Sequence, residues 1–373
     1  MIQDDFFKRI DIQYNHNLPF VVYRKPNEIK VSGMLQSTDD LIFTKDFTEK
    51  GFVFSPFDDA EKTVLMPIEA SEVITTTEQP VIPDGAKVQS IQDNTLADSK
   101  SIHIKLVNKG VEAINKGVFK KVVLSRKETV ELEDNNPISI FKRLLNKYAS
   151  AFVYCWYHPK VGLWLGATPE TLVKIEGTRF SIMALAGTQD YKGSLNVVWQ
   201  DKEKQEQKFV TDFIVDSLQD TVEHLQISKT ETVKAGNLLH LKTMISARLK
   251  PNSTLKEVIT NIHPTPAVCG LPKQEAKVFI VKNEDYKREF YTGFLGELNL
   301  DIVKAPRSGK RNIENRAYAI TKKSTQLYVN LRCMQIQDNK AIIYIGGGVT
   351  INSHADSEWE ETVSKSQVIK SIL

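Results

Sequence analysis

The stretch GGGVTINSHADSEWEETVSKSQ, residues 346–367, follows the apolar segment AIIYI (341–345) and predicts a strand, a glycine-rich turn and a helix. Glutamates gather where this helix begins, and Glu358 and Glu361 are three residues apart. Residues at that spacing share one face of a helix. Lys365 follows Glu361 by about one helical turn. The stretch therefore predicts a helix that presents two carboxylates and an amine on one side.

A second acidic pair with the same spacing lies upstream, where Glu203 and Glu206 fall in another predicted helix. Carboxylates that converge from two helices suit a hard cation such as Mg²⁺, which takes one or two of them directly and keeps several waters. The plain alternative is a solvated helix face, because glutamates at a helix start complement its dipole. In that case Glu203 and Glu206 could form ion pairs with Lys202, Lys204 and Lys208. Spacing alone favours this alternative.

Composition places the chain among ordinary globular proteins. It has 373 residues, of which 41% are hydrophobic and 25% charged, enough for a large core. The net charge of +3, with scattered basic residues, argues against a nucleic-acid partner. Cys155, Cys269 and Cys333 lie far apart in apolar surroundings and predict reduced core thiols. Neither a signal peptide nor an apolar run of about 18 residues is present, so we expect a cytoplasmic protein without a membrane segment.

The pattern of apolar residues predicts an α+β fold with large, mostly antiparallel sheets and helices on their outer faces. Residues 1–70 predict short strands joined by polar turns, and residues 75–100 predict a surface connection. We do not divide the chain there, because the first strands alone would form a weak core. Farther on, NLLHLKTMISARL (237–249) and QLYVNLRCMQI (326–336) each predict one strand. Helices are predicted at 103–117, 137–149, 200–224, 254–262, 273–284 and 356–372.

Eight short motifs make the sequence recognisable. They are KKVVLSR (120–126), GATPE (166–170), ALAGT (184–188), HPTPAVCGLP (263–272), REFYTGFLGEL (288–298), LRC (331–333), GGGV (346–349) and SEWEETVSK (357–365). In this order they resemble the chorismate-utilising enzymes, which include isochorismate, salicylate, anthranilate and aminodeoxychorismate synthases. The resemblance implies that residues 101–373 form the chorismate-binding catalytic region. It also implies that residues 1–100 complete the same fold.

The resemblance gives the acidic pairs a role. Glu206 and Glu361 match the family's direct Mg²⁺ ligands, and Glu203 and Glu358 match carboxylates that hold metal-bound waters. One departure is Gln207, where the family commonly has histidine after the first ligand. Another is SHADSEW, where an Asp-Pro pair is usual before the helix.

The resemblance also implies an acid and a base. Lys121 would activate a water that attacks ring carbon 2, and Glu170 would protonate the departing 4-hydroxyl. Arg332, placed on the NLRC strand, would bind a substrate carboxylate bidentately. Each residue has a plain alternative outside the family: Lys121 as a strand-end lysine whose amine reaches solvent, and Arg332 as part of a core ion pair.

Other motif positions imply contacts with chorismate. Gly187 and Gly346 would let peptide N–H groups approach the substrate, since neither has a Cβ. His263 is interpreted as structural, at a turn. The remaining residues that the resemblance assigns to substrate binding are Thr188, His240, Ala267, Tyr291 and Lys365.

The nucleophile separates the members of the family. Water-using members have lysine at the position of Lys121, and this chain has no glutaminase segment, so no amidotransferase partner is expected. Ala267 stands where salicylate synthases usually have threonine, which favours isochorismate as the product. A salicylate synthase and a catalytically silent, anion-binding homologue stay open as alternatives. The sequence also leaves open whether the product feeds a menaquinone or a siderophore pathway, which oligomer the protein forms and what the long segment 301–324 does.

Overall fold

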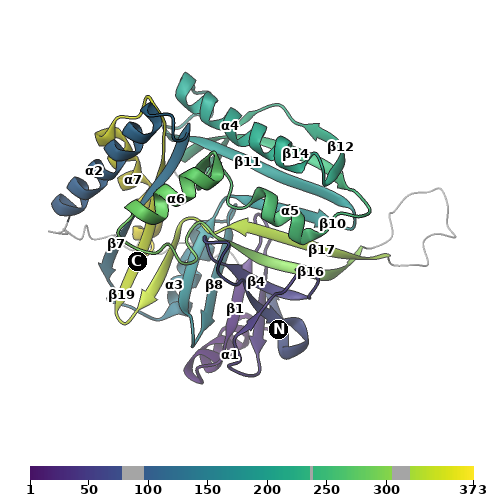
Figure 1. Cartoon of the computed structure of the whole chain (residues 1–373). Coiled ribbons are helices and arrows are strands. Elements are labelled where there is room, and N and C mark those ends of the chain that lie inside the picture. The colour runs from purple at the N-terminus through teal and green to yellow at the C-terminus, as the bar shows by residue number, and fades with distance from the viewer. Residues whose placement is uncertain (78–95, 236–237, 305–319) are drawn as a thin grey trace.

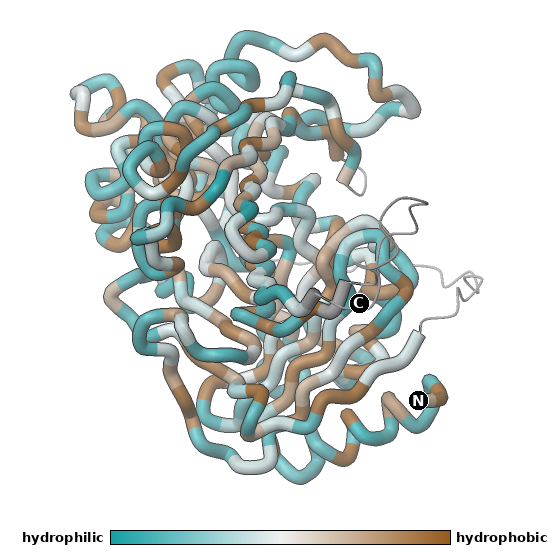
Figure 2. The backbone as a smooth tube through the Cα atoms, turned by 90° about the vertical axis from the view of Figure 1, so that its right-hand side faces the viewer, coloured by the Kyte–Doolittle hydropathy of each residue, from teal (hydrophilic) through white to brown (hydrophobic). Residues whose placement is uncertain are grey.

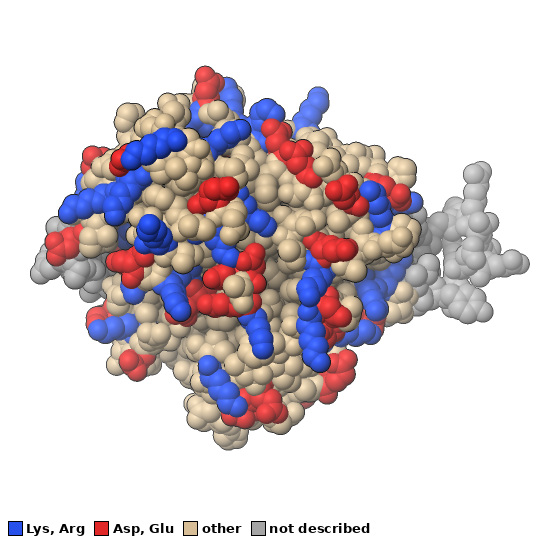
Figure 3. Space-filling view, in the orientation of Figure 1, with Lys and Arg blue, Asp and Glu red and all other residues tan. Residues whose placement is uncertain are grey.

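A computed structural model of the chain describes residues 1–77, 96–235, 238–304 and 320–373. Within them, two large antiparallel sheets face one another, with helices on the outer sides (Figure 1). This confirms the predicted α+β class. None of the described helices is long and apolar enough to span a membrane. Basic and acidic side chains are interspersed on the face shown in Figure 3.

The first sheet runs across the lower part of the molecule. Its neighbouring strands are antiparallel, and β1 pairs with β8 from Phe20 opposite Tyr157 to Arg24 opposite Val153. The order is β15 (Gly270–Leu271), β7 (Lys121–Glu131), β19 (Lys340–Val349), β18 (Cys333–Gln337), β9 (Gly162–Thr168), β8 (Phe152–His158), β1 (Phe20–Arg24), β2 (Lys30–Gln36) and β6 (Ser71–Thr77).

The second sheet combines the middle of the chain with another part of the N-terminal region. Its order is β12 (Val222–Ile227), β14 (Leu238–Leu249), β11 (Arg179–Asp190), β10 (Thr171–Glu176), β17 (Ile320–Val329), β16 (Phe294–Lys304), β4 (Gly51–Ser55), β5 (Val64–Pro67) and β3 (Ile42–Phe43). A further strand, β13 (Glu231–Ala235), pairs with β14. Because β4 pairs with β16, strands from the first 77 residues belong to both sheets.

Helices cover the outer faces and form their own apolar contacts. Local signals start several of them: Asn136 Oδ1 accepts hydrogen bonds from two backbone N–H groups, and Thr254 and Glu257 form a capping box. The helices are α1 (Gln3–Asn15), α2 (Leu96–Asn115), α3 (Pro137–Lys147), α4 (Asp201–Leu218), α5 (Leu255–Ile262), α6 (Lys273–Asn283) and α7 (Ala355–Lys370), with a 3₁₀ turn at Ile68–Ala70. In Figure 1, α4 and α5 lie beside β11 and β14, and α2, α6 and α7 lie beside β7 and β19.

Aromatic side chains fill the space between the two sheets. The Phe152 ring of β8 stacks on the Tyr328 ring of β17 with centroids 4.1 Å apart, and Phe54 of β4 lies edge-on to Trp156 of β8 at 5.0 Å. Figure 2 shows hydrophobic residues along many extended segments of the chain, with hydrophilic residues in many surrounding turns. Such ring pairs add to the stability that burial of their area supplies. This apolar layer holds the two sheets together beside the pocket described next.

Three details differ from the sequence-based expectations. The helix predicted over 200–224 ends at Leu218, and Val222–Ile227 form β12. Residues 3–15 form helix α1 rather than strands, because Phe6, Phe7 and Ile10 share one helical face that packs into the core. QLYVNLRCMQI is not one strand either. It divides into β17 and β18 in different sheets, and Arg332 lies between them with a φ of +48°. The strand prediction for Arg332 is therefore wrong.

Candidate active site

A pocket lies where the two sheets meet the N-terminal part of α4 and the middle of α7. Most of the residues predicted from the motifs line it, although they come from distant parts of the chain. Those lining residues are Glu170, Gly187, Thr188, Glu206, His240, Ala267, Tyr291, Arg332, Gly346, Glu361 and Lys365. Of the other predicted residues, Lys121 contacts Glu206, whereas Glu203 and Glu358 are not among the residues that line the pocket.

Lys121 and Glu206 form an ion pair at the base of the pocket. The Lys121 Nζ lies 2.8 Å from Glu206 Oε1, and the Lys121 side chain is fully buried. Burial opposes ionisation of Glu206, but the charges of Lys121, Lys365 and Lys202 together lower its pKa below the ordinary value. A lysine buried in this way does not reach solvent, so the snorkelling alternative is wrong.

Gly348 allows this pair to form, although the sequence analysis did not single it out. A Cβ on Gly348 would lie 2.4 Å from Glu206 Oε1 and 3.3 Å from Lys121 Cε. Any larger residue would displace the carboxylate or the amine. The glycine run in GGGV signals that some position there needs a glycine, but the run alone does not indicate that Gly348 is that position.

Glu170 is a buried carboxyl group with an unusual protonation state. It directly precedes β10, and its backbone N–H donates to Thr168 Oγ1 at 3.3 Å. Burial raises its pKa to about 8, in spite of the opposing charges of Lys121 and Arg332. The group is therefore largely protonated near neutral pH and can donate a proton inside the pocket.

Arg332 presents an uncommitted guanidinium to the same pocket. Its backbone is in the left-handed region, and its carbonyl oxygen accepts a hydrogen bond from the Ala167 N–H at 3.1 Å, which fixes the residue between the sheets. In the part of the chain that the structure describes, its side chain has no ion pair or hydrogen bond. Burial lowers its pKa from the usual value, yet arginine remains charged. The core ion-pair alternative is thus not seen among these residues, and the group is free to bind an anion.

His240 adds a neutral hydrogen-bond acceptor. Its Nδ1 lies 2.8 Å from the Gly187 carbonyl oxygen, so Nδ1 carries the hydrogen and donates it. Burial, together with the charge of Arg332, lowers the His240 pKa to about 3, and the ring is neutral. Its Nε2 is buried and has no hydrogen-bond partner among the described residues. Nε2 can therefore accept a hydrogen bond from a hydroxyl in the pocket.

Glycine and tyrosine form part of the opposite wall. The Tyr291 ring stacks on Tyr344 with centroids 5.5 Å apart. A Cβ on Gly346 would lie 2.7 Å from the Tyr291 hydroxyl, so only glycine fits there. Gly187 has a φ of +74° and packs against the Glu203 side chain, which makes glycine favourable at this position too. His263, predicted to be structural, is buried beside the Phe294 ring outside the pocket lining.

The carboxylates of α7 are paired with lysines. Glu361 Oε1 lies 2.5 Å from Lys365 Nζ, which also donates to the Gly346 carbonyl oxygen at 2.9 Å. Glu358 Oε1 lies 2.5 Å from Lys202 Nζ of α4. The predicted alternative, in which α4 lysines pair with Glu203 and Glu206, is wrong for Lys202. It is also wrong for Lys204 and Lys208, which pair with Asp201 and Asp212.

The four carboxylates are not arranged as a closed metal site. Among the described residues, no three or more His, Cys, Asp or Glu side chains are grouped closely enough to hold a metal ion. Glu203 instead accepts a hydrogen bond from the Gln200 backbone N–H at 2.9 Å, where α4 begins. Glu206 and Glu361 nevertheless line one pocket, and Glu358 Oε2 is buried without a hydrogen-bond partner. These oxygen donors fit a hard divalent cation such as Mg²⁺.

Gln207, the departure from the family pattern, has a structural role. Its Nε2 donates to the Ala184 carbonyl oxygen at 3.1 Å and to Thr243 Oγ1 at 3.0 Å. These bonds tie α4 to β11 and β14 directly behind Glu206. Glutamine thus anchors the helix that carries the carboxylate.

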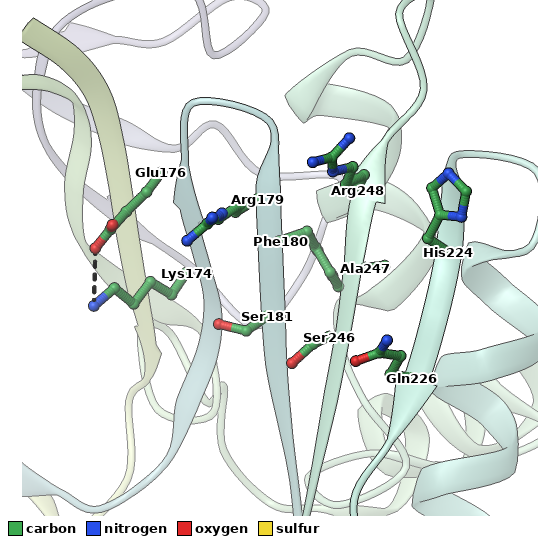
Figure 4. A pocket seen from close by; sticks show the side chains of 10 residues that line it. All are labelled: Lys174, Glu176, Arg179, Phe180, Ser181, His224, Gln226, Ser246, Ala247 and Arg248. Atoms are coloured by element: carbon green, nitrogen blue, oxygen red, sulfur yellow. Dashed lines mark ion pairs between the residues drawn. The ribbon is translucent and has the colours of Figure 1, made fainter. Parts of the chain in front are cut away.

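A second, shallow hollow lies elsewhere on the second sheet, at the outer ends of β10, β11 and β14 (Figure 4). Lys174 Nζ and Glu176 Oε1 form an ion pair there at 3.1 Å. Arg179 lies opposite Arg248 in the strand register, and both side chains are exposed. Because these side chains are exposed, water and salt can screen their charges. The hollow therefore differs from the pocket, whose acid and amine are buried.

Comparisons with known proteins agree with the motifs. Sequence models of the chorismate binding enzymes match residues 50–303 and 318–371. The isochorismate synthase MenF of Pasteurella multocida is 28% identical over 280 residues, which are 72% of this chain and 60% of that protein. The isochorismate synthase DhbC of Bacillus subtilis is 26% identical over 279 residues, 69% of this chain and 64% of that protein. The chain thus spans less than two thirds of these relatives.

A solved structure extends the agreement to the fold. The DhbC protein of Bacillus anthracis, assigned as a 2,3-dihydroxybenzoate-specific isochorismate synthase, matches with a TM-score of 0.75 at 20% identity. The match covers 95% of this chain and 96% of that one. At this identity the likeness concerns the fold, and it includes the N-terminal strands that carried no motif.

Proposed function

Because the chain belongs to the chorismate-binding enzymes, we propose that it converts chorismate to isochorismate with Mg²⁺ as cofactor. One observation carries the proposal most directly. A protonated carboxyl group, Glu170, and a buried amine, Lys121, serve one pocket that also presents the free guanidinium of Arg332. An acid, a base and an anion-binding group are what an exchange of hydroxyl groups on a dianionic ring requires.

The reaction exchanges one hydroxyl group for another and leaves the composition unchanged. With its amine in the neutral form, Lys121 accepts a proton from a water as the water oxygen forms a bond to ring carbon 2. The ring double bonds shift, and the bond from carbon 4 to its hydroxyl oxygen breaks. Glu170 gives its proton to that departing oxygen, so water leaves. A proton passes from the lysine back to the carboxylate through solvent before the next turnover, which restores both groups.

Binding groups orient the substrate for this exchange. Arg332 pairs with a carboxylate of chorismate, and Lys365 lies close enough to the pocket to add a second positive charge. His240 Nε2, which lacks a partner in the described structure, accepts a hydrogen bond from a substrate hydroxyl. Positioning of this kind supplies a large part of the rate enhancement in enzymes.

Glu206 and Glu361 are the residues that would hold Mg²⁺, and Glu203 and Glu358 would hold its waters. When bound, the ion supplies positive charge that neutralises a substrate carboxylate. The protein's own contribution is to keep Glu206 ionised, which the lowered pKa of that group supports. The buried free thiols of Cys155, Cys269 and Cys333 accord with a cytoplasmic location, which we include in the proposal.

Product identification tests the proposal. The purified chain is incubated with chorismate and Mg²⁺ at neutral pH, with and without EDTA, and the products are separated by chromatography. Isochorismate that forms only in the absence of EDTA is the expected result. Chorismate recovered unchanged under all conditions would instead indicate a silent, anion-binding homologue.

The same experiment distinguishes the second candidate, a salicylate synthase. Such an enzyme would eliminate pyruvate from isochorismate in the same pocket. Ala267 lines that pocket with a methyl group where a salicylate synthase usually has a hydroxyl, so we expect the reaction to stop at isochorismate. Salicylate and pyruvate in equal amounts, with only transient isochorismate, would show that this expectation is wrong.

A further inference from the structure

Each of three acidic residues near the pocket is paired with a lysine. Lys121 pairs with Glu206, Lys365 with Glu361 and Lys202 with Glu358. The first two lysines have roles in the proposed reaction, one as base and one beside the substrate. Lys202 has none, because it does not line the pocket. Its contact with Glu358 therefore needs a separate explanation.

Lys202 reaches from the first turn of α4 across to α7. Its Nζ lies 2.5 Å from Glu358 Oε1, and the Glu358 side chain is only 1% exposed. Burial alone would lower the Lys202 pKa, but the charges of Glu358, Glu361 and Glu206 raise it. The ammonium group thus stands within the field of the three carboxylates that surround the proposed cation site.

The ionised form of Glu358 would be unfavourable without this partner. Burial raises its pKa first, the charge of Glu361 raises it further, and Lys202 opposes both effects. Its second oxygen, Oε2, has no hydrogen-bond partner among the described residues although it is buried. An ionised carboxylate in such surroundings needs a nearby positive charge, supplied either by the protein or by a bound cation.

We propose that Lys202 is an internal counter-ion, which occupies the acidic cluster in the metal-free protein and leaves it when a divalent cation binds. The inference rests on the proposed function, because it concerns the same metal site. Lys202 is a positioning residue: it holds the Glu358 carboxylate in place through their ion pair, and it sets the affinity for Mg²⁺ by competing with the ion.

The geometry permits this exchange. An ammonium group and a divalent cation repel each other strongly at short range in a partly buried site. The Lys202 side chain is 26% exposed, so its amine can turn toward water, whereas the fully buried Lys121 has no such path. Lys202 is therefore the lysine of the three whose departure disturbs the proposed chemistry least.

Calorimetric titration of the full chain with MgCl₂, without chorismate, tests the proposal. Lys202→Met removes the competing charge, and we expect Mg²⁺ to bind about tenfold more tightly than in the native protein. Lys202→Arg keeps the charge and should stay near the native affinity. Lys208→Met is the matched control, since Lys208 lies on the same helix and pairs with the exposed Asp212.

Thermal unfolding gives an independent readout. In EDTA, Lys202→Met should melt below the native protein, because Glu358 loses its partner. Excess Mg²⁺ should raise the Tm of this variant more than that of the native chain. Lys202→Gln, which can still donate a hydrogen bond to Glu358, replaces the methionine variant if the latter does not fold.

The outcomes separate this inference from the proposed function. Unchanged or weaker Mg²⁺ affinity in the uncharged Lys202 variants, or no Mg²⁺ binding to any of the proteins, would overturn the counter-ion role. Isochorismate formation in the same preparations is scored separately. Tighter Mg²⁺ binding in Lys202→Met with no product from chorismate would support the counter-ion role and refute the proposed isochorismate synthase activity.

Discussion

The pocket and the exposed hollow of Figure 4 both use residues of β11 and β14 and residues in or directly before β10, yet they differ in chemistry. Each set contains a carboxylate, a histidine, an arginine and a lysine. The pocket set is Glu170, His240, Arg332 and Lys121, and the hollow set is Glu176, His224, Arg248 and Lys174.

Burial accounts for the difference. In the pocket it raises the pKa of Glu170 to about 8 and contributes to lowering that of His240 to about 3, so an acid and a neutral acceptor coexist near pH 7. In the hollow, Lys174 and Glu176 pair at the surface, where such pairs contribute little. The residue types alone do not indicate a catalytic site. The comparison provides matched controls, and four predictions follow from it in order of decreasing effect.

The largest effect is expected for Lys121→Gln. Without a base, water is a poor nucleophile, and turnover should fall by about 10³-fold or more. Lys174→Gln in the hollow should change the rate by less than about twofold. Turnover is followed by chromatography of isochorismate, and circular dichroism checks that each variant is folded. A Lys121→Gln protein that turns over at the native rate would show that the base lies elsewhere.

Glu170→Gln should lower kcat by about 10²-fold to 10³-fold with little change in KM, because the amide keeps the shape but lacks the proton. Glu176→Gln is its control. The native rate should also fall as the pH rises through about 8, since the Glu170 carboxyl group loses its proton there. Steady-state kinetics from pH 6 to 9.5 measure both effects. A variant with native kcat and only a raised KM would make Glu170 a binding residue.

Arg332→Lys should raise KM about tenfold, because a lysine keeps the charge but loses the bidentate contact with a carboxylate. The hollow variant Arg248→Lys should leave KM unchanged. Both values come from initial rates over a range of chorismate concentrations. An equal KM for native and Arg332→Lys proteins would remove the guanidinium from substrate binding.

The smallest effect concerns stability. The folded-state pKa of Glu170 is raised from 4.5 to about 8, so the folded protein retains a proton that the unfolded chain loses. The associated stability is complete below about pH 4.5 and is lost as the pH rises through about 8. Glu170→Gln should therefore raise the Tm by a few degrees more at pH 8.5 than at pH 5.5. Glu176→Gln should show no such difference in thermal melts.

Short-range patterns made much of the fold predictable. Asn136 is a good capping residue, and helix Pro137–Lys147 begins directly after it. Thr254 and Glu257 likewise form the capping box that starts α5. Helix α1 was missed because the strand pattern that follows it was extended to the whole of residues 1–70. The split between β17 and β18 was missed too, since an arginine in the left-handed region gives no local signal.

The candidate site was predictable where the motifs stand and unpredictable where contacts cross the chain. Eleven of the fourteen predicted site residues do line one pocket. Lys202, by contrast, pairs with a glutamate that is 156 positions away, and its neighbours on α4 seemed the natural partners. Glu203, expected to hold a metal-bound water, also accepts a hydrogen bond from the Gln200 N–H where α4 begins, which its spacing from Glu206 did not indicate. The geometry of such pairs depends on how two helices pack, which spacing within one helix does not determine.

The pairing of β1 with β8 and of β4 with β16 has a consequence for how the chain folds as it is synthesised. Within the first 77 residues, β1 pairs with β2 and β4 with β5, so these hairpins can form early. The other edge of β1 stays unpaired until Phe152–His158 have been synthesised, and that of β4 until Phe294–Lys304 have been synthesised. Until those strands leave the ribosome, apolar edges remain open to water and to other nascent chains. The nascent chain is therefore exposed to misassociation until its second half has been made.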